Sequence, residues 1–456
     1  MSAAEPTAPA LLPPQAPSFW AAFKFWLWLG CLSFGGPAGQ IALMHQELVE
    51  RRRWISERRF LHALNYCMLL PGPEAQQLAT YIGWLLHRGW GGLMAGALFV
   101  LPSLLLLIGL SWLYVVHGQQ PLVAGLFFGI KPAVTALVLQ AAHRLGGRVL
   151  RNRWLWAIAV AAFVAIFALK LPFPLIIGAA ALVGWLGGRW RPDAFATGGG
   201  HGGAQAVSAG PALIDDHTPT PAHARFTRRG LARVLGLGLG LWLLSMTALW
   251  LWGGREGVLA QMGWFFSKAA MLTFGGAYAV LPYVFQGAVE QQQWLTAAQM
   301  MDGLALGEST PGPLIMVVAF VGFVGGWGAQ LLGPEAQFAG AALAAGVVTW
   351  FTFLPSFVFI LAGGPLVEAT HGRLGFTAPL TAISAAVVGV ILNLALFFAL
   401  HLLWPLGWGG RFDGVSAALM LAAAWALLRW KWGVPRVLAA SALLGLAAQH
   451  AVALIS

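Results

Sequence analysis

The sequence predicts an all-α polytopic membrane protein built from two homologous halves, which we expect to be inverted repeats with broken or re-entrant helices. Of its 456 residues, 59% are apolar and only 9% are charged, whereas a soluble protein carries about 25% charged residues. The apolar residues run in continuous blocks rather than in the alternating pattern of an outer-membrane barrel. A series of short motifs also recurs at a fixed offset along the chain.

The composition excludes several other classes of protein. A mean hydropathy of +0.75 and 23 Trp residues do not fit a water-soluble enzyme or a disordered chain. The net charge of +11 does not indicate nucleic-acid binding, because the arginines lie in short clusters between apolar blocks, as membrane topology requires. The sequence has no phosphate-binding GxxxxGK[ST] loop, no HExxH and no Cys/His cluster. We therefore expect neither an enzyme nor a bound cofactor or metal.

The order of the apolar blocks predicts the organisation of the chain. We expect a disordered tail (1–18), a first half (19–188), a flexible polar linker (189–230), a connecting transmembrane helix (231–258) and a second half (259–456). Thirteen blocks can be counted, some of them as broken or re-entrant segments: 19–44, 60–86, 90–116, 121–142, 154–169, 172–187, 231–253, 259–284, 300–324, 336–363, 377–400, 414–430 and 434–453.

The repeat is visible when the sequence is shifted by 240 residues. SFGG at 33–36 then meets TFGG at 273–276, WIS at 54–56 meets WLT at 294–296, and PGP at 71–73 meets PGP at 311–313. Farther on, LPS at 101–103 meets LPS at 354–356, now at an offset of 253. This ordered series of matches indicates two homologous halves.

The number of crossings predicts how the halves are oriented. Six crossings return the chain to its starting side, so the extra helix at 231–253 turns the second half over and gives an inverted repeat, as in many secondary transporters. The arginine cluster at 51–59 would then lie outside, against the positive-inside rule. A re-entrant 60–86 with the N-terminus outside is the alternative, and it would make the halves parallel unless another block also failed to cross.

Two kinds of helix break recur in both halves. One is the Phe-Gly-Gly segment at 34–36 and 274–276, and the other is the Pro-Gly-Pro segment at 71–73 and 311–313. We expect Pro37 at the first position of a new helix, and Thr310 as the cap of a helix that starts at Pro311. Irregular backbone at membrane depth lines a cavity or is buried in protein. Four breaks in symmetric positions therefore predict an anion site at the interface between the halves.

Ionisable side chains inside apolar blocks are rare and costly, so each is a candidate for function. Lys24 and Lys268 precede the two Phe-Gly-Gly breaks, although Lys24 is also consistent with a side chain that extends to a membrane interface. Glu74 and Glu308 flank the two Pro-Gly-Pro segments on opposite sides, and we expect them to act in proton coupling. Lys131 and Asp302 are further candidates, although Asp302 is also consistent with a position near a helix end.

The cluster Arg51, Arg52 and Arg53 has an uncharged counterpart, Gln291–Gln293. It is consistent with a topology or headgroup anchor. The alternative is an electrostatic funnel that concentrates an anion at one mouth of the pathway.

The segment 34–84 strongly resembles the signature region of the chromate ion transporters, and TFGGAYAVLPYV at 273–284 and GLALGESTPGPLI at 303–315 resemble the signatures of that family's second half. The resemblance covers 19–455 apart from the linker. It implies a multi-pass carrier of the bacterial inner membrane that exports chromate and confers chromate resistance, driven by the membrane potential, the proton gradient or both. A carrier of sulfate or another oxyanion and an anion channel are the alternatives.

The implied partners are the chromate dianion, or sulfate, with protons and the lipid bilayer, and no nucleic acid; a homodimer is an alternative to a monomer. The expected substrate-binding residues are the members of the four breaks and nearby polar side chains: Lys24, Phe34, Gly35, Gly36, Pro37, Gln40, Pro71, Gly72, Pro73, Gln76, Gln77, Lys268, Phe274, Gly275, Gly276, Ser309, Thr310, Pro311, Gly312 and Pro313.

Overall fold

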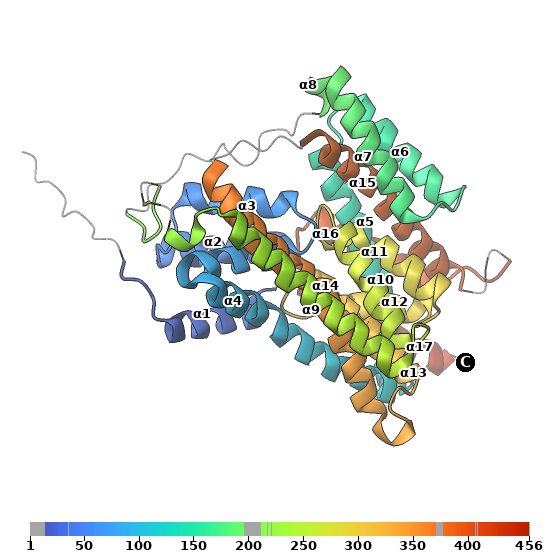
Figure 1. The fold of residues 1–456 in the computed structure, drawn as a ribbon. Coiled ribbons are helices and arrows are strands. Elements are labelled where there is room, and N and C mark those ends of the chain that lie inside the picture. The colour runs from blue at the N-terminus through green and yellow to red at the C-terminus, as the bar shows by residue number, and fades with distance from the viewer. Residues whose placement is uncertain are drawn as a thin grey trace, which may run out of the picture.

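The computed structural model describes residues 14–34, 36–195, 211–216, 218–219, 221–370, 377–405, 407 and 409–455, and these residues form helices with no strand among them. The expected tail at 1–18 and the expected linker at 189–230 therefore lie partly outside the described residues. Figure 1 shows α1–α3 at one end of the molecule and α6–α8 at the other, with the long helices α9 and α14 between them.

The same series of elements occurs twice. In the first half it is α1 (Phe19–Leu32), α2 (Gly36–His45), the π-helical η1 (Gln46–Arg51), α3 (Glu57–Leu69), α4 (Glu74–His117), α5 (Pro121–Val149), α6 (Arg153–Phe167) and α7 (Phe173–Trp190). In the second half it is α10 (Val258–Leu272), α11 (Ala277–Phe285), the π-helical η3 (Gln286–Gln291), α12 (Ala297–Ser309), η4 with α13 (Leu314–Met316, Val317–Gly328), η5 with α14 (Pro334–Ala336, Gln337–Thr370), α15 (Thr377–Leu403), α16 (Gly414–Leu428) and α17 (Val434–Ile455).

Three further helices join the halves. The short α8 (Pro192–Phe195) and η2 (Ala222–Ala224) belong to the linker, and α9 (Arg228–Gly253) is the expected connecting helix. The register of 240 residues holds for the boundaries of whole elements, since η1 and η3 match end to end, as do α3 and α12. Two π-helical turns in the same register are a detail that the repeat in the sequence does not by itself predict.

Local sequence explains where these helices start. The Ser56 hydroxyl accepts a hydrogen bond from the Arg59 backbone N–H at 3.3 Å and caps α3. Its counterpart Thr296 caps α12 through a reciprocal pair of hydrogen bonds with Gln299. Both halves therefore begin their third helix with the same device, directly after the π-helical turn.

Six described helices are long and apolar enough to cross a membrane, which makes the chain a multi-pass membrane protein. They are α4, α5, α7, α9, α14 and α15. By contrast, α1, α3, α10 and α12 have only 13 to 15 residues. Each of these is about 20 Å long, against a hydrocarbon core of about 30 Å, so they are parts of broken membrane segments.

The block expected at 60–86 is interrupted at the predicted Pro-Gly-Pro break, but the expected boundary between this block and 90–116 is wrong. Its helix α3 ends at Leu69, the Pro-Gly-Pro segment interrupts the chain, and α4 begins at Glu74 and runs through the next expected block to His117. The chain kinks at His87 and Arg88, which have non-helical backbone angles, but it does not form a loop there.

The two halves are interleaved rather than packed as separate bodies. Helix α5 of the first half packs against α16 and α17 of the second, and α15 of the second half packs against α6 and α7 of the first. The contact between α5 and α17 is made at backbone distance: a Cβ on Gly129 would lie 1.9 Å from the Ser441 carbonyl oxygen, and Gly445 faces it. Small residues permit this close approach of membrane helices.

Candidate functional site

The four helix breaks meet in pairs, and each pair joins the two halves. The Gly72 N–H in the first Pro-Gly-Pro segment donates a 2.8 Å hydrogen bond to the carbonyl of Thr273 in the second Phe-Gly-Gly break. Reciprocally, the Gly312 N–H donates a 2.9 Å hydrogen bond to the carbonyl of Ser33. The sequence predicted four symmetric breaks. In the structure, the Pro-Gly-Pro break of each half is hydrogen-bonded to the Phe-Gly-Gly break of the other half.

A serine of the opposite half lies against each Pro-Gly-Pro glycine. A Cβ on Gly72 would lie 2.4 Å from Ser356 Oγ, and a Cβ on Gly312 would lie 2.7 Å from Ser103 Cβ. Both glycines also have positive φ, +131° and +99°, where a side chain is strained. These serines belong to the two LPS segments, which the sequence showed as part of the repeat but not as part of the site.

The place where the two pairs of breaks meet is called the crossing below. Three glutamines lie around it. Gln40 Nε2 donates to the Ser33 carbonyl at 3.1 Å and also to the Gly312 carbonyl, and Gln77 Nε2 donates to the Pro71 carbonyl at 2.8 Å. All three side chains, including Gln76, are fully buried or nearly so. Their Oε1 atoms have no hydrogen-bond partner. Buried polar atoms without partners are rare in folded proteins and point to a place for water or a ligand.

The two predicted proton-coupling carboxylates lie near the last turns of α5. Glu308 is buried and accepts a hydrogen bond from the Tyr278 hydroxyl. It interacts electrostatically with Arg144, while the half-buried Glu74 interacts with Arg148, one turn farther along the same helix. Carboxylates from both halves therefore face basic residues of one helix. Tyr278 and the two arginines were not among the expected site residues, since their partners are distant in sequence.

The structure places the other expected residues at different depths. The Pro-Gly-Pro residues from Thr310 to Pro313 are buried, whereas the Phe-Gly-Gly break is more open, with Phe34 at 41% exposure and Gly275 exposed. Gly35 lies outside the described residues. Of the remaining members, Gly72 and Pro73 are buried and Ser309 is exposed. The others are half-buried: Gly36, Pro37, Pro71, Phe274 and Gly276.

Two expectations for the start of helices had different outcomes. Pro37 is the second residue of α2, one place after the expected first position. The expectation for Thr310 is wrong: it caps the end of α12, and the next helix begins only after Pro313. A residue before proline prefers extended backbone, so Thr310 and Gly312, each followed by proline, hold the chain out of the helical region. Glu74, directly after Pro73, is the first residue of α4.

The two lysines are not drawn into the crossing. Lys24 and Lys268 are exposed, and each ammonium group lies 5.7 Å from the ring centroid of a tryptophan one turn earlier, Trp20 and Trp264. This position is typical of a cation held beside an aromatic ring on the outer surface of a helix.

Comparison with known proteins adds independent evidence. The sequence model of the chromate transporter family matches residues 20–185 and 260–446, one region in each half. The chain belongs to the chromate transporter family. The two matched regions confirm that the two halves are homologous.

Individual relatives in the chromate transporter family cover most of the chain. A chromate transport protein of Pseudomonas aeruginosa is 34% identical over 392 residues, which are 85% of this chain and 82% of the relative. One of Cupriavidus metallidurans is 29% identical over 428 residues, 93% and 92% of the two chains. The uncharacterized transporter YwrB of Bacillus subtilis is 29% identical over 151 residues, which are 32% of this chain but 77% of its own length. No solved structure matches the fold.

In this chromate transporter family member, the arginine cluster is largely paired. Arg51 binds Glu47 at 2.6 Å, and Arg52 approaches the same carboxylate at 3.4 Å while its guanidinium lies over the rings of Phe25 and Trp54. These contacts give the cluster a structural role. The electrostatic funnel stays a prediction.

The linker covers the end of the first half beside this cluster. Ile214 forms an isolated bridge with Ile55, the Ser56 hydroxyl donates to Asp216 at 2.6 Å, and Arg59 donates to the Thr218 carbonyl at 2.6 Å. These described linker residues are therefore docked on the transporter core, contrary to a wholly flexible linker.

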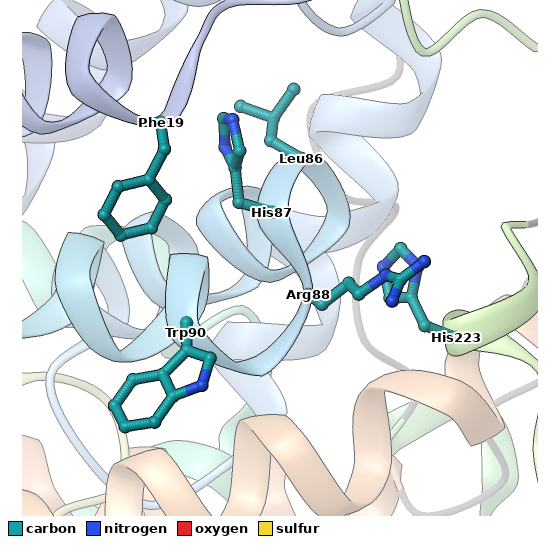
Figure 2. Close-up of a pocket in the computed structure, with 6 residues that line it drawn as sticks. All are labelled: Phe19, Leu86, His87, Arg88, Trp90 and His223. Carbon is teal, nitrogen blue, oxygen red and sulfur yellow. The ribbon is translucent and has the colours of Figure 1, made fainter.

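A hollow of about 520 Å³ lies where the linker meets the kink in α4 (Figure 2). Figure 2 shows the Arg88 side chain extending toward His223, while Phe19 and Trp90 lie on the other side of the hollow. Its two histidines are already used, since His87 Nε2 contacts the Pro17 carbonyl and His223 Nε2 contacts the Trp84 carbonyl. Aromatic and basic residues together are typical of a membrane interface, so this hollow is a docking point for the linker rather than a substrate site.

Proposed function

We propose that the chain is a secondary transporter that exports chromate across the bacterial inner membrane. The membership in the chromate transporter family and the two relatives named as chromate transport proteins support the substrate. The observation that carries the mechanism is the reciprocal pairing of Gly72 with Thr273 and of Gly312 with Ser33.

The pairing gives the crossing two arrangements. With both hydrogen bonds made, Gly72 and Gly312 are buried and their N–H groups are occupied by carbonyls of the opposite half. When the halves move apart, the Gly72 and Gly312 N–H groups become free, next to the uncapped first turns of α4 and η4. Free N–H groups at a helix start bind anions. A tetrahedral dianion would thus replace the Ser33 and Thr273 carbonyls and keep the halves apart until it is released.

The membrane potential supplies the direction. One elementary charge that crosses 100 mV changes its free energy by about 2.3 kcal/mol, so a dianion leaving an inside-negative cell gains about 4.6 kcal/mol. That corresponds to a gradient of roughly a thousandfold at equilibrium. Export of chromate therefore needs no ATP hydrolysis.

The decisive experiment measures chromate flux in inverted membrane vesicles with the membrane potential and the pH gradient imposed separately. We expect an interior-positive potential to drive chromate into such vesicles, and sulfate measured in parallel gives the substrate preference. Absence of chromate flux under both gradients would exclude the proposed function. Unitary currents in a planar bilayer would instead identify an anion channel.

Proton coupling is proposed for Glu74 and Glu308, whose carboxylates lie beside the breaks. Protonation of Glu74 at the start of α4 removes a negative charge that repels the anion. We expect Glu74→Gln to mimic the protonated state and to flatten the pH dependence of transport between about pH 5 and 8. A variant that keeps the wild-type dependence of flux on pH would show that Glu74 is structural.

A further inference from the structure

A second polar site lies away from the crossing, in a cavity of about 1000 Å³. The cavity lies between the end of α4, the start of α5, α12 and the end of α13, and it is lined by residues of both halves. Among its polar lining residues are Tyr114, Lys131, Gln293, Gln299 and Asp302. It is large enough for a hydrated oxyanion, because one water molecule occupies about 30 Å³ of liquid.

An ion pair between the halves lies in the wall of this cavity. Lys131 Nζ of α5 is 3.5 Å from Asp302 Oδ2 of α12, and the Tyr114 hydroxyl donates a 2.8 Å hydrogen bond to the same oxygen. The other oxygen, Oδ1, has no hydrogen-bond partner among the described residues, and the Asp302 side chain is only 4% exposed. A buried carboxylate with one oxygen left unpaired pays the cost of desolvation without full compensation. It is therefore well suited to take up a proton.

The charged groups around Asp302 are few. Lys131 on α5 and Tyr114 on α4 are the ones that interact with it electrostatically among the described residues. Helix α13 and η4, which also pack on α12, carry no ionisable side chain. His117 on α4 and the exposed Arg436 and His450 on α17 do not line the cavity.

The repeat shows that the ion pair in this cavity has no symmetry-related copy. At offsets of 240 and 253 residues, the counterparts of Asp302 and Lys131 are His62 and Ser384, so the ion pair has no equivalent. Three other lining residues, Trp294, Thr296 and Gln299, correspond to Trp54, Ser56 and Arg59.

Those three counterparts are the positions on which the linker docks, through Ile214, Asp216 and Thr218. The linker thus occupies in the first half the place that the open cavity occupies in the second. One mouth of the pseudo-symmetric molecule is covered and the other is open.

We propose that the open cavity is a proton-controlled binding site for a tetrahedral oxyanion, with Lys131 as its anchor and Asp302 as the group that releases Lys131 when it is protonated. This proposal rests on the proposed function, because it assigns a site where the same class of substrate binds before it reaches the crossing. When Asp302 is ionised, it holds Lys131 and repels an anion. When Asp302 is protonated, the Lys131 ammonium, with its three N–H donors, is free to bind the anion in the cavity.

The sign of the coupling follows from this competition. The anion and the Asp302 carboxylate compete for one ammonium group, so anion binding favours the protonated acid and protonation favours the anion. Anion affinity must therefore rise as the pH falls through the range in which Asp302 titrates. In the upper part of that range, uptake of one proton per anion corresponds to about a tenfold gain in affinity per pH unit.

The test measures binding rather than transport. Labelled chromate is titrated against the purified full-length protein in nanodiscs between pH 5.5 and 8, with its concentration counted as the dianion. Proton uptake is followed with a pH dye in weak buffer and is corrected for the protons that hydrogen chromate releases when it binds as the dianion. We expect wild-type affinity to rise as the pH falls, with protons taken up as chromate binds. Asp302→Asn should bind chromate at pH 8 more tightly than the wild type and should take up about one proton fewer per bound anion. Lys131→Gln should lose at least about tenfold in affinity at low pH.

Matched controls separate the site from general charge effects. Lys431→Gln and Asp193→Asn make the same changes at exposed positions outside the cavity lining and should bind like the wild type. A gain of affinity at pH 8 in Asp302→Asn is an outcome that misfolding cannot produce. The proposal is overturned if Asp302→Asn keeps the wild-type pH dependence of binding, or if Lys131→Gln binds chromate normally.

Failure of this inference and failure of the proposed function give different results. A wild-type protein that neither binds nor transports chromate contradicts the proposed function. A wild-type protein that transports chromate, but whose Asp302→Asn variant takes up as many protons per bound anion as the wild type, contradicts only the cavity site.

Discussion

Gly312 shows how tightly single residues are constrained where the halves meet. Its backbone N–H is bonded to the Ser33 carbonyl, its φ is +99°, and the space that a Cβ would need is filled by Ser103. Gly72 has the same three constraints in the other half. These positions require glycine because of both backbone conformation and contact distance.

We expect Gly312→Ala to reduce chromate transport at least about tenfold while the protein stays in the membrane. The left-handed backbone costs about 1–2 kcal/mol for a residue with a side chain, and overpacking against Ser103 adds about 1–3 kcal/mol. Adding Ser103→Gly removes the atom that is struck, so the double variant should regain part of the flux. Gly346→Ala, where nothing lies within 4 Å of the new Cβ, is the control. Equal flux in Gly312→Ala and the control would contradict the argument.

Sequence reasoning at this scale found the breaks but not the neighbours of the break residues. The Pro-Gly-Pro and Phe-Gly-Gly segments were recognisable because glycine and proline limit the backbone directly. For Lys24 the sequence left an outward position open as an alternative to a place in the site. It could not decide between the two, because every other residue of α1 except Cys31 is apolar or small and gives no polar face for comparison. Ser103 and Ser356 were marked by the repeat, yet a repeat shows that two positions are equivalent and not what they touch.

At the scale of elements, the linker is the part that differs most from expectation. Its described residues dock on the turn between η1 and α3, on α3 and on the first part of α4 through backbone and side-chain hydrogen bonds. Composition alone predicted a flexible segment, since short Gly-, Ala- and Pro-rich stretches carry few apolar residues. The buried Ile214 and Ala224, only 6% and 0% exposed, show that a few apolar side chains suffice to hold it.

Acid should release the linker. Burial lowers the pKa of His223 from 6.5 and the charge of Arg88 lowers it further, while the hydrogen bond to the Trp84 carbonyl opposes this shift. A lowered pKa means that the docked linker prefers the neutral imidazole. Its contribution to docking is present above pH 6.5, the value for the undocked side chain, and is lost as the pH falls through the lower value of the docked one.

The measurement is the labelling rate of a single cysteine at Ala212, which is buried under the docked linker, in a chain without its native cysteines. A cysteine at the exposed Ala222 serves as the reference. The ratio of the labelling rate at position 212 to that at position 222 should rise several-fold from pH 7.5 to 5.5. His223→Gln should abolish this rise. If the ratio changes equally with pH with and without the His223→Gln substitution, groups other than His223 control the docking of the linker.

For the whole molecule, the central fact is that each half completes the other. The family-model regions 20–185 and 260–446 are equivalent in sequence, but α5 packs with α16 and α17, and α15 packs with α6 and α7. Whether the repeat is inverted stays a prediction. Cysteines at Ser56 and Thr296, which are equivalent in the 240-residue register, should be labelled from opposite sides of the membrane if it is.

We expect neither half to accumulate alone as a folded protein. A chain cut between residues 196 and 210 and expressed as two fragments should transport chromate only when both fragments are present, because α5 and α15 each need helices of the other fragment. Fragment stability by protease resistance and chromate efflux in cells provide the two readouts. A first fragment that is protease-resistant on its own would contradict the importance of the interleaved packing.

The interleaved packing also determines when contacts between helices can form during synthesis of the chain. Helices α6 and α7 leave the ribosome long before α15, their packing partner in the second half. At about 5–20 residues per second, the interval from the end of α7 at Trp190 to the start of α15 at Thr377 is on the order of ten to forty seconds. During that time the faces that will contact α15 are covered only by lipid. The first half is therefore a waiting intermediate, and the chain's final shape is decided after synthesis of the second half rather than helix by helix.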